Sequence, residues 1–235
     1  MRDLQWQYNA WAEYLELQTN RLVIIHPGVF LLFCYNLVCM VQRFKEIHDQ
    51  ARKEHVPVMK DDGMAFLLDW LRNHTQVRDI LEIGTAVGLS AMEMASVRWD
   101  MTVDSLEVNP VMYAQAVKNV QAAGLADRVH CYLCDGAEFS SEKVYDLVFI
   151  DAAKSQYRRY LEHFWFNTRP GSFFVFDNLN FHGMVDDESL THNRSTVQMV
   201  HKIGAFREHL LQDERFDTVF YQDVGDGIAI ALRRQ

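Results

Sequence analysis

Short apolar runs alternate with amphipathic stretches along the chain from residue 79 onward. Five runs have the length and the β-branched or aromatic content of strands: DILEI at 79–83, TVDSLE at 102–107, RVHCYL at 128–133, VYDLVFI at 144–150 and SFFVF at 172–176. The last two are continuous, as expected of strands that are covered on both faces. Strand and helix in strict alternation predict a parallel, doubly wound α/β sheet.

Helices are predicted in the segments between these strands. One begins near Leu89, and a second opens at Pro110 and ends before Gly124. A third runs from Lys154 to about Phe166 and is ended by the Arg-Pro-Gly sequence at 169–171.

The two ends of this alternation have different patterns. Upstream, Asp61 or Asp62 is expected to cap a helix. Its wide apolar stripe comprises Met64, Phe66, Leu67, Leu68, Trp70 and Leu71. Downstream, FDTVFYQ at 216–222, a Gly-Asp-Gly turn at 225–227 and IAIALR at 228–233 predict a hairpin. We therefore expect one antiparallel strand to close the sheet.

Composition places the chain among ordinary globular proteins, with 235 residues of which 49% are hydrophobic and 23% charged. Its formal net charge of -9 repels polyanions, so nucleic-acid binding requires a local basic patch. The four cysteines are Cys34, Cys39, Cys131 and Cys134. Because no cleavable signal pattern accompanies them, a reducing compartment is indicated, and we expect a cytoplasmic protein.

The apolar stretch from Leu22 to Val41 is the one feature that argues for a membrane. A spanning helix needs about 20 apolar residues, but His26-Pro27-Gly28 interrupts this run. The unbroken part, Val29 to Val41, fits a buried helix or an oligomer interface. We therefore expect a homodimer and no membrane span, with a solvated amphipathic helix following at 43–54.

The loops after the first three strands favour an adenosine cofactor. Gly84 and Gly88 follow the first strand, where they allow a ligand to approach the backbone closely at the start of a helix. The G-x-G-x-x-G sequence that cradles a dinucleotide is missing, which disfavours NAD. Glu107 ends the second strand, where it can accept hydrogen bonds from ribose hydroxyls, and Asp135 follows the third, where it can meet an adenine amino group.

Oxygen ligands follow the fourth and fifth strands. Asp151 comes directly after the fourth strand, and Asp177-Asn178 comes after the fifth. Neighbouring strands lie about 4.8 Å apart, so these side chains can share one hard cation such as Mg²⁺. Each aspartate alone could simply cap a loop, but the paired placement favours a cation site. Lys154 is close enough in sequence to form a salt bridge there or to act as a general base.

These segments resemble the cation-dependent, class I S-adenosylmethionine O-methyltransferases that include the catechol and caffeoyl-CoA enzymes. The resemblance covers about residues 56–233. It is carried, in the family order, by DILEIGTAVGLSAMEMA, YDLVFIDAAKSQYRRYL, TRPGSFFVFDNLNFHGMV and GDGIAIAL. It implies a Rossmann-like methyltransferase fold with a mostly parallel seven-stranded sheet, a C-terminal antiparallel hairpin and N-terminal helices. The expected domains are a helical extension at 1–54 and the methyltransferase domain at 55–235.

The resemblance also implies roles for individual residues. The expected cofactor contacts are Met59, Glu82, Gly84, Ser90, Glu107, Asp135, Gly136 and Asp151. Asp151, Asp177 and Asn178 are expected to hold Mg²⁺ or another divalent cation such as Mn²⁺, and Lys154 is the expected catalytic residue. The chain departs from the family at Cys134-Asp135-Gly136, where Gly-Asp-Ala is usual, and at Ser172, where a second glycine is usual.

Two acceptors are compatible with this chemistry. VPVM and AAKSQYRRY are most similar to the bacterial branch that contains the tRNA 5-hydroxyuridine methyltransferase, so we favour 5-hydroxyuridine in the tRNA anticodon loop. Arg158 and Arg159 could hold a polynucleotide or simply face solvent, and the acidic run at 186–188 counts against phosphate. The alternative acceptor is a catechol, caffeoyl or other small phenol. A catalytically silent binding or membrane-attached protein is a third hypothesis, which the intact acidic and lysine residues oppose.

Weaker signals are given structural interpretations. Cys131 and Cys134 form a C-x-x-C in an apolar strand without a second pair, so buried structural thiols are expected rather than a zinc site. His182 could line the acceptor pocket, but a surface loop position is the expectation.

Overall fold

The computed structural model describes residue 40 and residues 42–235, and residues 47–235 form one compact unit. The apolar 22–41 stretch lies outside the described residues, apart from Met40. Residues 42–53 are helical, and most of their side chains are exposed or half-buried, in agreement with the amphipathic pattern there. The domain boundary expected between residues 54 and 55 stays a prediction.

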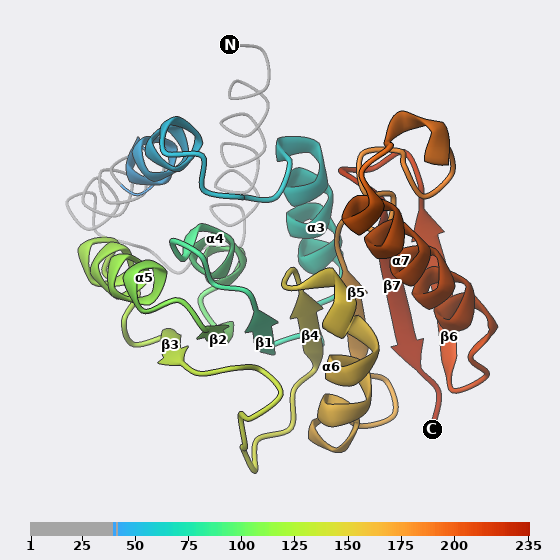
Figure 1. The fold of residues 1–235 in the computed structure, drawn as a ribbon. Coiled ribbons are helices and arrows are strands. Elements are labelled where there is room, and N and C mark those ends of the chain that lie inside the picture. Colours follow the sequence, from blue (N-terminus) through green and yellow to red (C-terminus); the bar gives the residue numbers. More distant parts are fainter. Residues whose placement is uncertain (1–39, 41) are drawn as a thin grey trace. The chain divides into compact units, whose positions relative to one another are not determined.

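A seven-stranded sheet forms the centre of this unit, with the strand order β3-β2-β1-β4-β5-β7-β6 (Figure 1). The strands are β1 Asp79–Ile83, β2 Thr102–Glu107, β3 Val129–Leu133, β4 Leu147–Ile150, β5 Phe173–Phe176, β6 Phe216–Tyr221 and β7 Ile228–Arg233. Strands β1 to β5 run parallel, and β7 is antiparallel to both β5 and β6. The doubly wound sheet and its closing hairpin are confirmed.

Helices cover both faces of the sheet, with α3, α4 and α5 on one face and α6 and α7 on the other (Figure 1). The helices are α3 Asp61–Asn73, α4 Leu89–Ser96, α5 Pro110–Ala122, α6 Tyr157–His163 and α7 Arg194–Gln212, with 3₁₀ turns η1 Lys154–Gln156, η2 Phe164–Asn167 and η3 Glu188–Leu190. The helix predicted from Lys154 is therefore η1, α6 and η2 in succession. The sequence pattern did not lead us to assign α7.

The start of α3 differs from the prediction. Lys60 occupies the N-cap, and Asp61 and Asp62 lie in the first helical turn without capping it. Both carboxylates have other partners. Asp61 Oδ1 lies 3.0 Å from His48 Nε2 and 2.8 Å from Arg52 Nη2, while Asp62 accepts from the backbone N–H of Gly225 at 2.9 Å. These long-range bonds are what the local pattern could not show.

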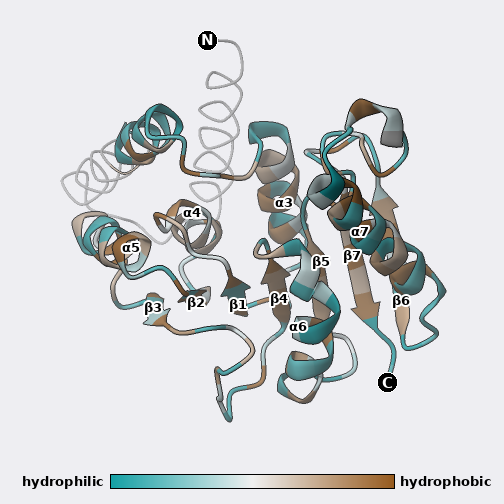
Figure 2. Cartoon of the chain, viewed as in Figure 1, coloured by the Kyte–Doolittle hydropathy of each residue, from teal (hydrophilic) through white to brown (hydrophobic). Residues whose placement is uncertain are grey.

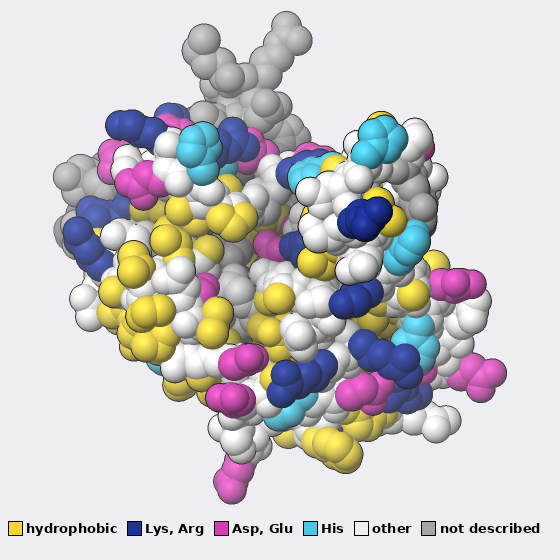
Figure 3. Space-filling model, in the orientation of Figure 1, with side chains coloured by type: hydrophobic (Ala, Val, Ile, Leu, Met, Phe, Trp, Pro, Cys, Tyr) yellow, Lys and Arg dark blue, Asp and Glu magenta, His cyan; other side chains and the backbone are white. Residues whose placement is uncertain are grey.

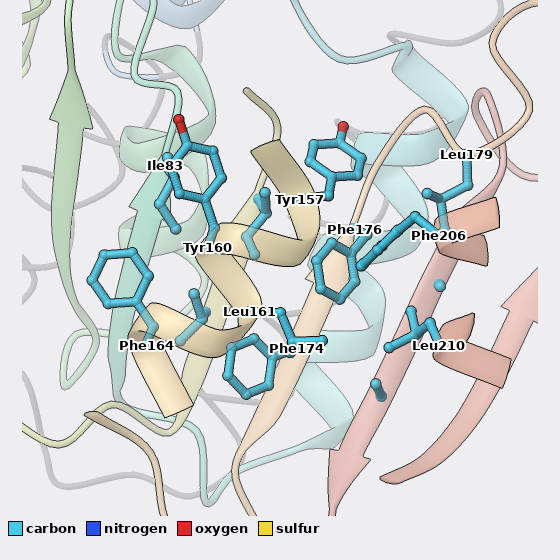
Figure 4. Packing of buried hydrophobic residues seen from close by; sticks show 14 of the residues in the cluster. Ile83, Tyr157, Tyr160, Leu161, Phe164, Phe174, Phe176, Leu179, Phe206 and Leu210 are labelled. Atoms are coloured by element: carbon cyan, nitrogen blue, oxygen red, sulfur yellow. The ribbon is translucent and has the colours of Figure 1, made fainter. Parts of the chain in front are cut away.

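The core between the sheet and helices α6 and α7 is built from aromatic rings (Figure 4). The ring centroids of Phe176 and Phe206 lie 4.9 Å apart, and those of Tyr157 and Phe176 lie 5.7 Å apart. Every residue of β4 and β5 is buried, which confirms that these strands are covered on both faces. Figure 2 shows the same strands as predominantly hydrophobic, while the helices carry polar outer faces.

The sheet register brings the expected site residues to one edge. Ile83 of β1 pairs with Ile150 of β4, which pairs with Phe176 of β5. The residues that come directly after these three strands are Gly84, Asp151 and Asp177. Since all three strands are parallel, these residues meet at the carboxyl edge, where ligands bind in doubly wound sheets.

Candidate active site

Gly84 allows the loop after β1 to pass directly beside the end of β4. Its φ is +108°, and a Cβ atom added there would lie 2.0 Å from the backbone oxygen of Asp151. Only glycine fits this contact, because both the conformation and the space exclude a side chain. The Gly84 N–H donates to the backbone oxygen of Leu106 at 3.0 Å, which also ties the loop to β2.

Glu82 is a buried acid that links β1 to α4 and β2. Ser90 donates to its Oε1 at 2.5 Å, and Ser105 donates to its Oε2. Burial is the main cause that raises the pKa of Glu82 to about 7, against the lowering effect of the two serine hydroxyls. The structure therefore brings the predicted residues Glu82 and Ser90 together at the start of α4.

Glu107 organises the two loops on either side of it. Its Oε2 accepts from the Ala86 N–H, and its Oε1 accepts from the Asn109 N–H, both at 2.8 Å. A carboxylate has about four acceptor positions, so two positions are left for ligand hydroxyls. Ala86 has a φ of +46°, so the carboxylate stabilises a left-handed residue within the predicted cofactor loop.

Exposed apolar residues flank the acids at this part of the edge. Val108 and Val111, beyond the end of β2, are 69% and 67% exposed, and Leu133 at the end of β3 is 50% exposed. Figure 3 shows apolar side chains gathered on the side of the viewed surface that carries α4 and α5. This apolar surface was not predicted from the sequence. The available signal was a valine directly after the acid that ends β2.

Gly136 and Met59 are tightly packed, whereas Asp135 is half-buried. A Cβ at Gly136 would lie 2.9 Å from Ile83 Cγ2, so the loop after β3 lies directly against β1. Asp135 Oδ1 accepts from the Ala137 N–H at 2.8 Å. Met59 is buried before α3, and no described contact joins its side chain to the acids at the carboxyl edge.

Asp151, Asp177 and Asn178 form one cluster after β4 and β5. The Asn178 Nδ2 lies 3.1 Å from Asp151 Oδ1 and 2.9 Å from Asp177 Oδ2, so one amide group bridges the two carboxylates. The pKa of Asp177 is raised, first by burial and then by the charge of Asp151. The sequence prediction that these three side chains converge is therefore matched by the geometry.

Lys154 lies at the rim of this cluster. Its Nζ is 3.2 Å from Asp151 Oδ1 and 6.0 Å from the centre of the Tyr157 ring. The side chain is 19% exposed, so its charge stands at the boundary between the cluster and solvent. The salt bridge considered in the sequence analysis is present, and the general-base role stays a prediction.

The cluster has the chemistry of a hard-cation site. The described part of the chain has no group of three or more His, Cys, Asp or Glu side chains placed to hold a metal ion. Here, however, the third member is an asparagine. The two carboxylates are oxygen donors of the kind that Mg²⁺ and Mn²⁺ prefer, and a rotation of the Asn178 amide that exchanges Nδ2 for Oδ1 adds a third. The mutual repulsion of the carboxylates is relieved by positive charge, so these residues fit a divalent cation.

The remaining candidates lie outside this cluster or differ from the prediction. The His182 side chain is 63% exposed on the loop after β5, as expected of a surface histidine. Cys131 and Cys134 are free but only half-buried, which corrects the expectation of buried thiols, because β3 lies at the edge of the sheet. Burial still raises the pKa of the Cys131 thiol to about 12, so it stays protonated.

Comparison with known proteins decides the family. The O-methyltransferase family matches residues 35–234. The chain belongs to the O-methyltransferase family. It is 31% identical to a catechol O-methyltransferase of Niastella koreensis over 70% of this chain and 77% of that protein. It is 32% identical to a catechol O-methyltransferase of Mycobacterium tuberculosis over 79% of this chain and 84% of that protein.

Solved structures agree with this O-methyltransferase assignment. The S-adenosylmethionine complex of the O-methyltransferase TomG from Streptomyces achromogenes is 25% identical and superposes with a TM-score of 0.65, over 82% of this chain and 90% of that chain. The protein is thus an S-adenosylmethionine-dependent O-methyltransferase with the expected Rossmann-like fold. Within the residues described, no helix is long and apolar enough to cross a membrane.

Proposed function

We propose that this O-methyltransferase transfers the methyl group of S-adenosylmethionine to an acidic hydroxyl held beside Asp151, Asp177, Asn178 and Lys154, and that the acceptor is a catechol or another small phenol. The observation that carries the proposal is the bridged pair of carboxylates, with the lysine ammonium 3.2 Å from one of them. This cluster lies at the same sheet edge as the Gly84 and Glu107 loops, where the cofactor is expected.

Different residues of the chain would bind the cofactor and act on the acceptor. Glu107 has acceptor positions left for the ribose hydroxyls, and the exposed Val108 and Leu133 offer apolar surface to the adenine ring. Once its ammonium has released a proton to solvent, Lys154 is placed to take the proton from the acceptor hydroxyl at its Nζ. Binding the two reactants at one edge of the sheet fixes their mutual orientation, which removes part of the entropic barrier to transfer.

Asp151, Asp177 and Asn178 would hold Mg²⁺ or Mn²⁺, which lowers the pKa of a coordinated hydroxyl and fixes its position. We expect EDTA to abolish methyl transfer and added Mg²⁺ to restore it. S-adenosylmethionine should still bind by calorimetry in the presence of EDTA, because the Glu107 loops contain no cation ligand and Asp151 is the one residue expected to serve both the cofactor and the cation. Full turnover after complete removal of divalent cations would remove the cation from the proposal.

The acceptor is the finer part of the proposal. A small phenol is supported by the catechol O-methyltransferases among the relatives. The tRNA wobble 5-hydroxyuridine is a second candidate, supported by Arg158 and Arg159, which are both exposed at the start of α6. The net charge of -9 and the exposed Asp186 and Asp187 oppose a polyanionic acceptor. These observations favour the small phenol.

A paired assay separates the two acceptors. Purified enzyme with S-adenosylmethionine and Mg²⁺ is given either catechol and caffeoyl substrates or hydroxylated tRNA from a strain that lacks the modification. Methylation of the phenols, unaffected by Arg158→Ala or Arg159→Ala, is expected. Methylation of the tRNA alone, weakened by both substitutions and by added salt, would instead support the nucleic-acid acceptor.

We further propose that the enzyme acts in the cytoplasm as a homodimer. The apolar 22–41 stretch of the sequence supports an oligomer interface, and the unpaired thiols Cys131 and Cys134 support a reducing compartment. Light scattering of the full chain tests the dimer, and a monomer at micromolar concentration would contradict it.

A further inference from the structure

The loop after β5 carries unusual backbone strain. Asn178, Phe181 and His182 have φ values of +62°, +46° and +60°, although none of them is glycine. Left-handed conformations of such residues persist only where neighbouring groups enforce them. Since this loop begins with a member of the Asp151, Asp177 and Asn178 cluster, whatever enforces it also acts on the active site.

The buried carboxylate of Asp226 binds the His182 end of this loop. Asp226 lies in the turn between β6 and β7 and is only 5% exposed. Its Oδ1 and Oδ2 both accept from the His182 N–H, at 2.8 and 2.9 Å. The His182 Nδ1 lies 3.5 Å from Oδ2, and Lys60 Nζ lies 3.5 Å from Oδ1.

Backbone bonds continue the contact on both sides of Asp226. Leu179 N–H donates to the Gly227 oxygen at 2.9 Å, and Asn180 N–H donates to the Asp226 oxygen at 2.8 Å. A Cβ at Gly227 would lie 2.6 Å from Asn180 Cγ, so the turn and the loop are in direct contact. The β6–β7 turn therefore holds the loop along most of its length.

The same turn also contacts the cluster itself. A Cβ at Gly225 would lie 3.7 Å from Asp177 Oδ1 and 3.2 Å from the Cα of Gly63 in α3. The side chain of Asp62 accepts from the Gly225 N–H at 2.9 Å. The turn is thus fixed against α3 on one side and supports the end of β5 on the other.

We propose that Asp226 is a positioning residue for methyl transfer, because its carboxylate holds the His182 end of the 178–182 loop and thereby keeps Asn178, at the other end, beside Asp151 and Asp177. The role in transfer rests on the proposed function, whereas the hold on the loop does not. Without the carboxylate, the His182 N–H loses its partner and the strained His182 end of the loop is released, while the two backbone bonds from Leu179 and Asn180 to the turn remain. The cofactor loops at Gly84 and Glu107 are held by separate bonds.

The test compares Asp226→Ala, Asp226→Asn and a matched control, Asp146→Asn. Asp146 is also a buried aspartate that accepts two backbone N–H bonds, from Arg78 at 2.9 Å and Asp79 at 3.1 Å, but it lies before β4 at the opposite edge of the sheet. Two properties are measured on the full chain. They are hydrogen exchange of a peptide covering 178–183, and the KM and kcat for catechol with saturating S-adenosylmethionine.

Asp226→Ala should speed exchange of this peptide and raise the KM for catechol by about 10-fold or more, the usual consequence of losing a charged hydrogen-bond partner. Affinity for S-adenosylmethionine should be unchanged. Asp226→Asn keeps one oxygen for the His182 N–H and should recover part of both effects. His182→Ala keeps the backbone N–H, so exchange of the peptide should stay slow. Asp146→Asn should alter neither property, even where it lowers the melting temperature.

Unchanged exchange and unchanged KM in Asp226→Ala would overturn the proposal, as would equal effects in Asp146→Asn. If the unsubstituted protein methylates no phenol, the proposed acceptor fails. The exchange measurement then decides the role of Asp226 by itself, since slow exchange in Asp226→Ala overturns its hold on the loop and fast exchange supports it.

Discussion

The absence of a side chain at Gly84 allows the loop after β1 to contact the end of β4 at the carboxyl edge of the sheet. Gly84→Ala would place a methyl group 2.0 Å from the Asp151 oxygen, in a backbone with a φ of +108°. We expect it to lower the free energy of unfolding in urea by about 3 kcal/mol or more. Gly124→Ala is the matched control, because its φ is +70° but no atom lies within 4 Å of the added carbon. That control should cost about 1 kcal/mol, and equal losses would show that the contact is not tight.

The buried acid Glu82 should make stability depend on pH. Its pKa is about 7 in the folded protein against an ordinary value of 4.5, so the folded state holds the proton more tightly. The contribution of Glu82 to the free energy of unfolding therefore falls as the pH rises from about 4.5 through about 7. Glu82→Gln should gain stability relative to the unsubstituted protein by about 1–3 kcal/mol between pH 5 and pH 8. Glu214→Gln, at an exposed position, should show no such gain. If the free energies of unfolding of Glu82→Gln and the unsubstituted protein differ by the same amount at every pH, the raised pKa of Glu82 is refuted.

Lys154 tests the proton-transfer role at the rim of the cluster. Lys154→Ala should reduce kcat by roughly 10²- to 10⁴-fold if the amine takes the acceptor proton. Lys154→Arg keeps the positive charge but cannot release a proton near neutral pH, so it should be similarly slow. Lys118→Ala, at an exposed position of α5, is the control. Near-normal turnover in Lys154→Arg would leave only an electrostatic role.

Among the secondary-structure elements, helix α5 has its start fixed by an N-cap residue and a proline. The Asn109 side chain accepts from the N–H groups of Val111 at 2.9 Å and Met112 at 3.3 Å, and Pro110 begins the helix. Asn109→Ala should lower the free energy of unfolding by about 1 kcal/mol, while Asn109→Asp should retain the cap. Thermal unfolding of the three proteins measures both effects. Equal melting temperatures for all three would contradict the capping role.

The strands were predictable because their residues combine burial with β-branched or aromatic side chains. The limits of β1 and β2 match the predicted runs, but β4 begins three residues later than its apolar run, at Leu147. Asp146 instead uses its side chain to accept the backbone N–H groups of Arg78 and of Asp79, where β1 begins. Helix α7 has four buried residues among 19, so its apolar stripe is narrow. Its spacing at Val200, Ile203, Phe206 and Leu210 was nevertheless a helical signal.

At the scale of the whole molecule, the parallel sheet explains why the cluster was predictable. Parallel strands end at one edge, so residues directly after β4 and β5 had to meet there. The contacts that hold the site from behind were not predictable. Gly63 and Gly225 touch although they are far apart in the sequence, and Asp226 reaches the loop at His182. Such contacts depend on how α3 and the closing hairpin pack, which local patterns do not report.

The most direct test of the account is methyl transfer by an enzyme whose cluster has lost one charge. Catechol, S-adenosylmethionine and Mg²⁺ are incubated with the unsubstituted protein, Asp177→Asn or Asp146→Asn, and the methylated phenol is measured by mass spectrometry. Product is expected with the unsubstituted protein and with Asp146→Asn. Asp177→Asn should be slower by about 10²-fold or more, with S-adenosylmethionine binding intact by calorimetry. Unimpaired transfer by folded Asp177→Asn would contradict the claim that methyl transfer takes place at this cluster.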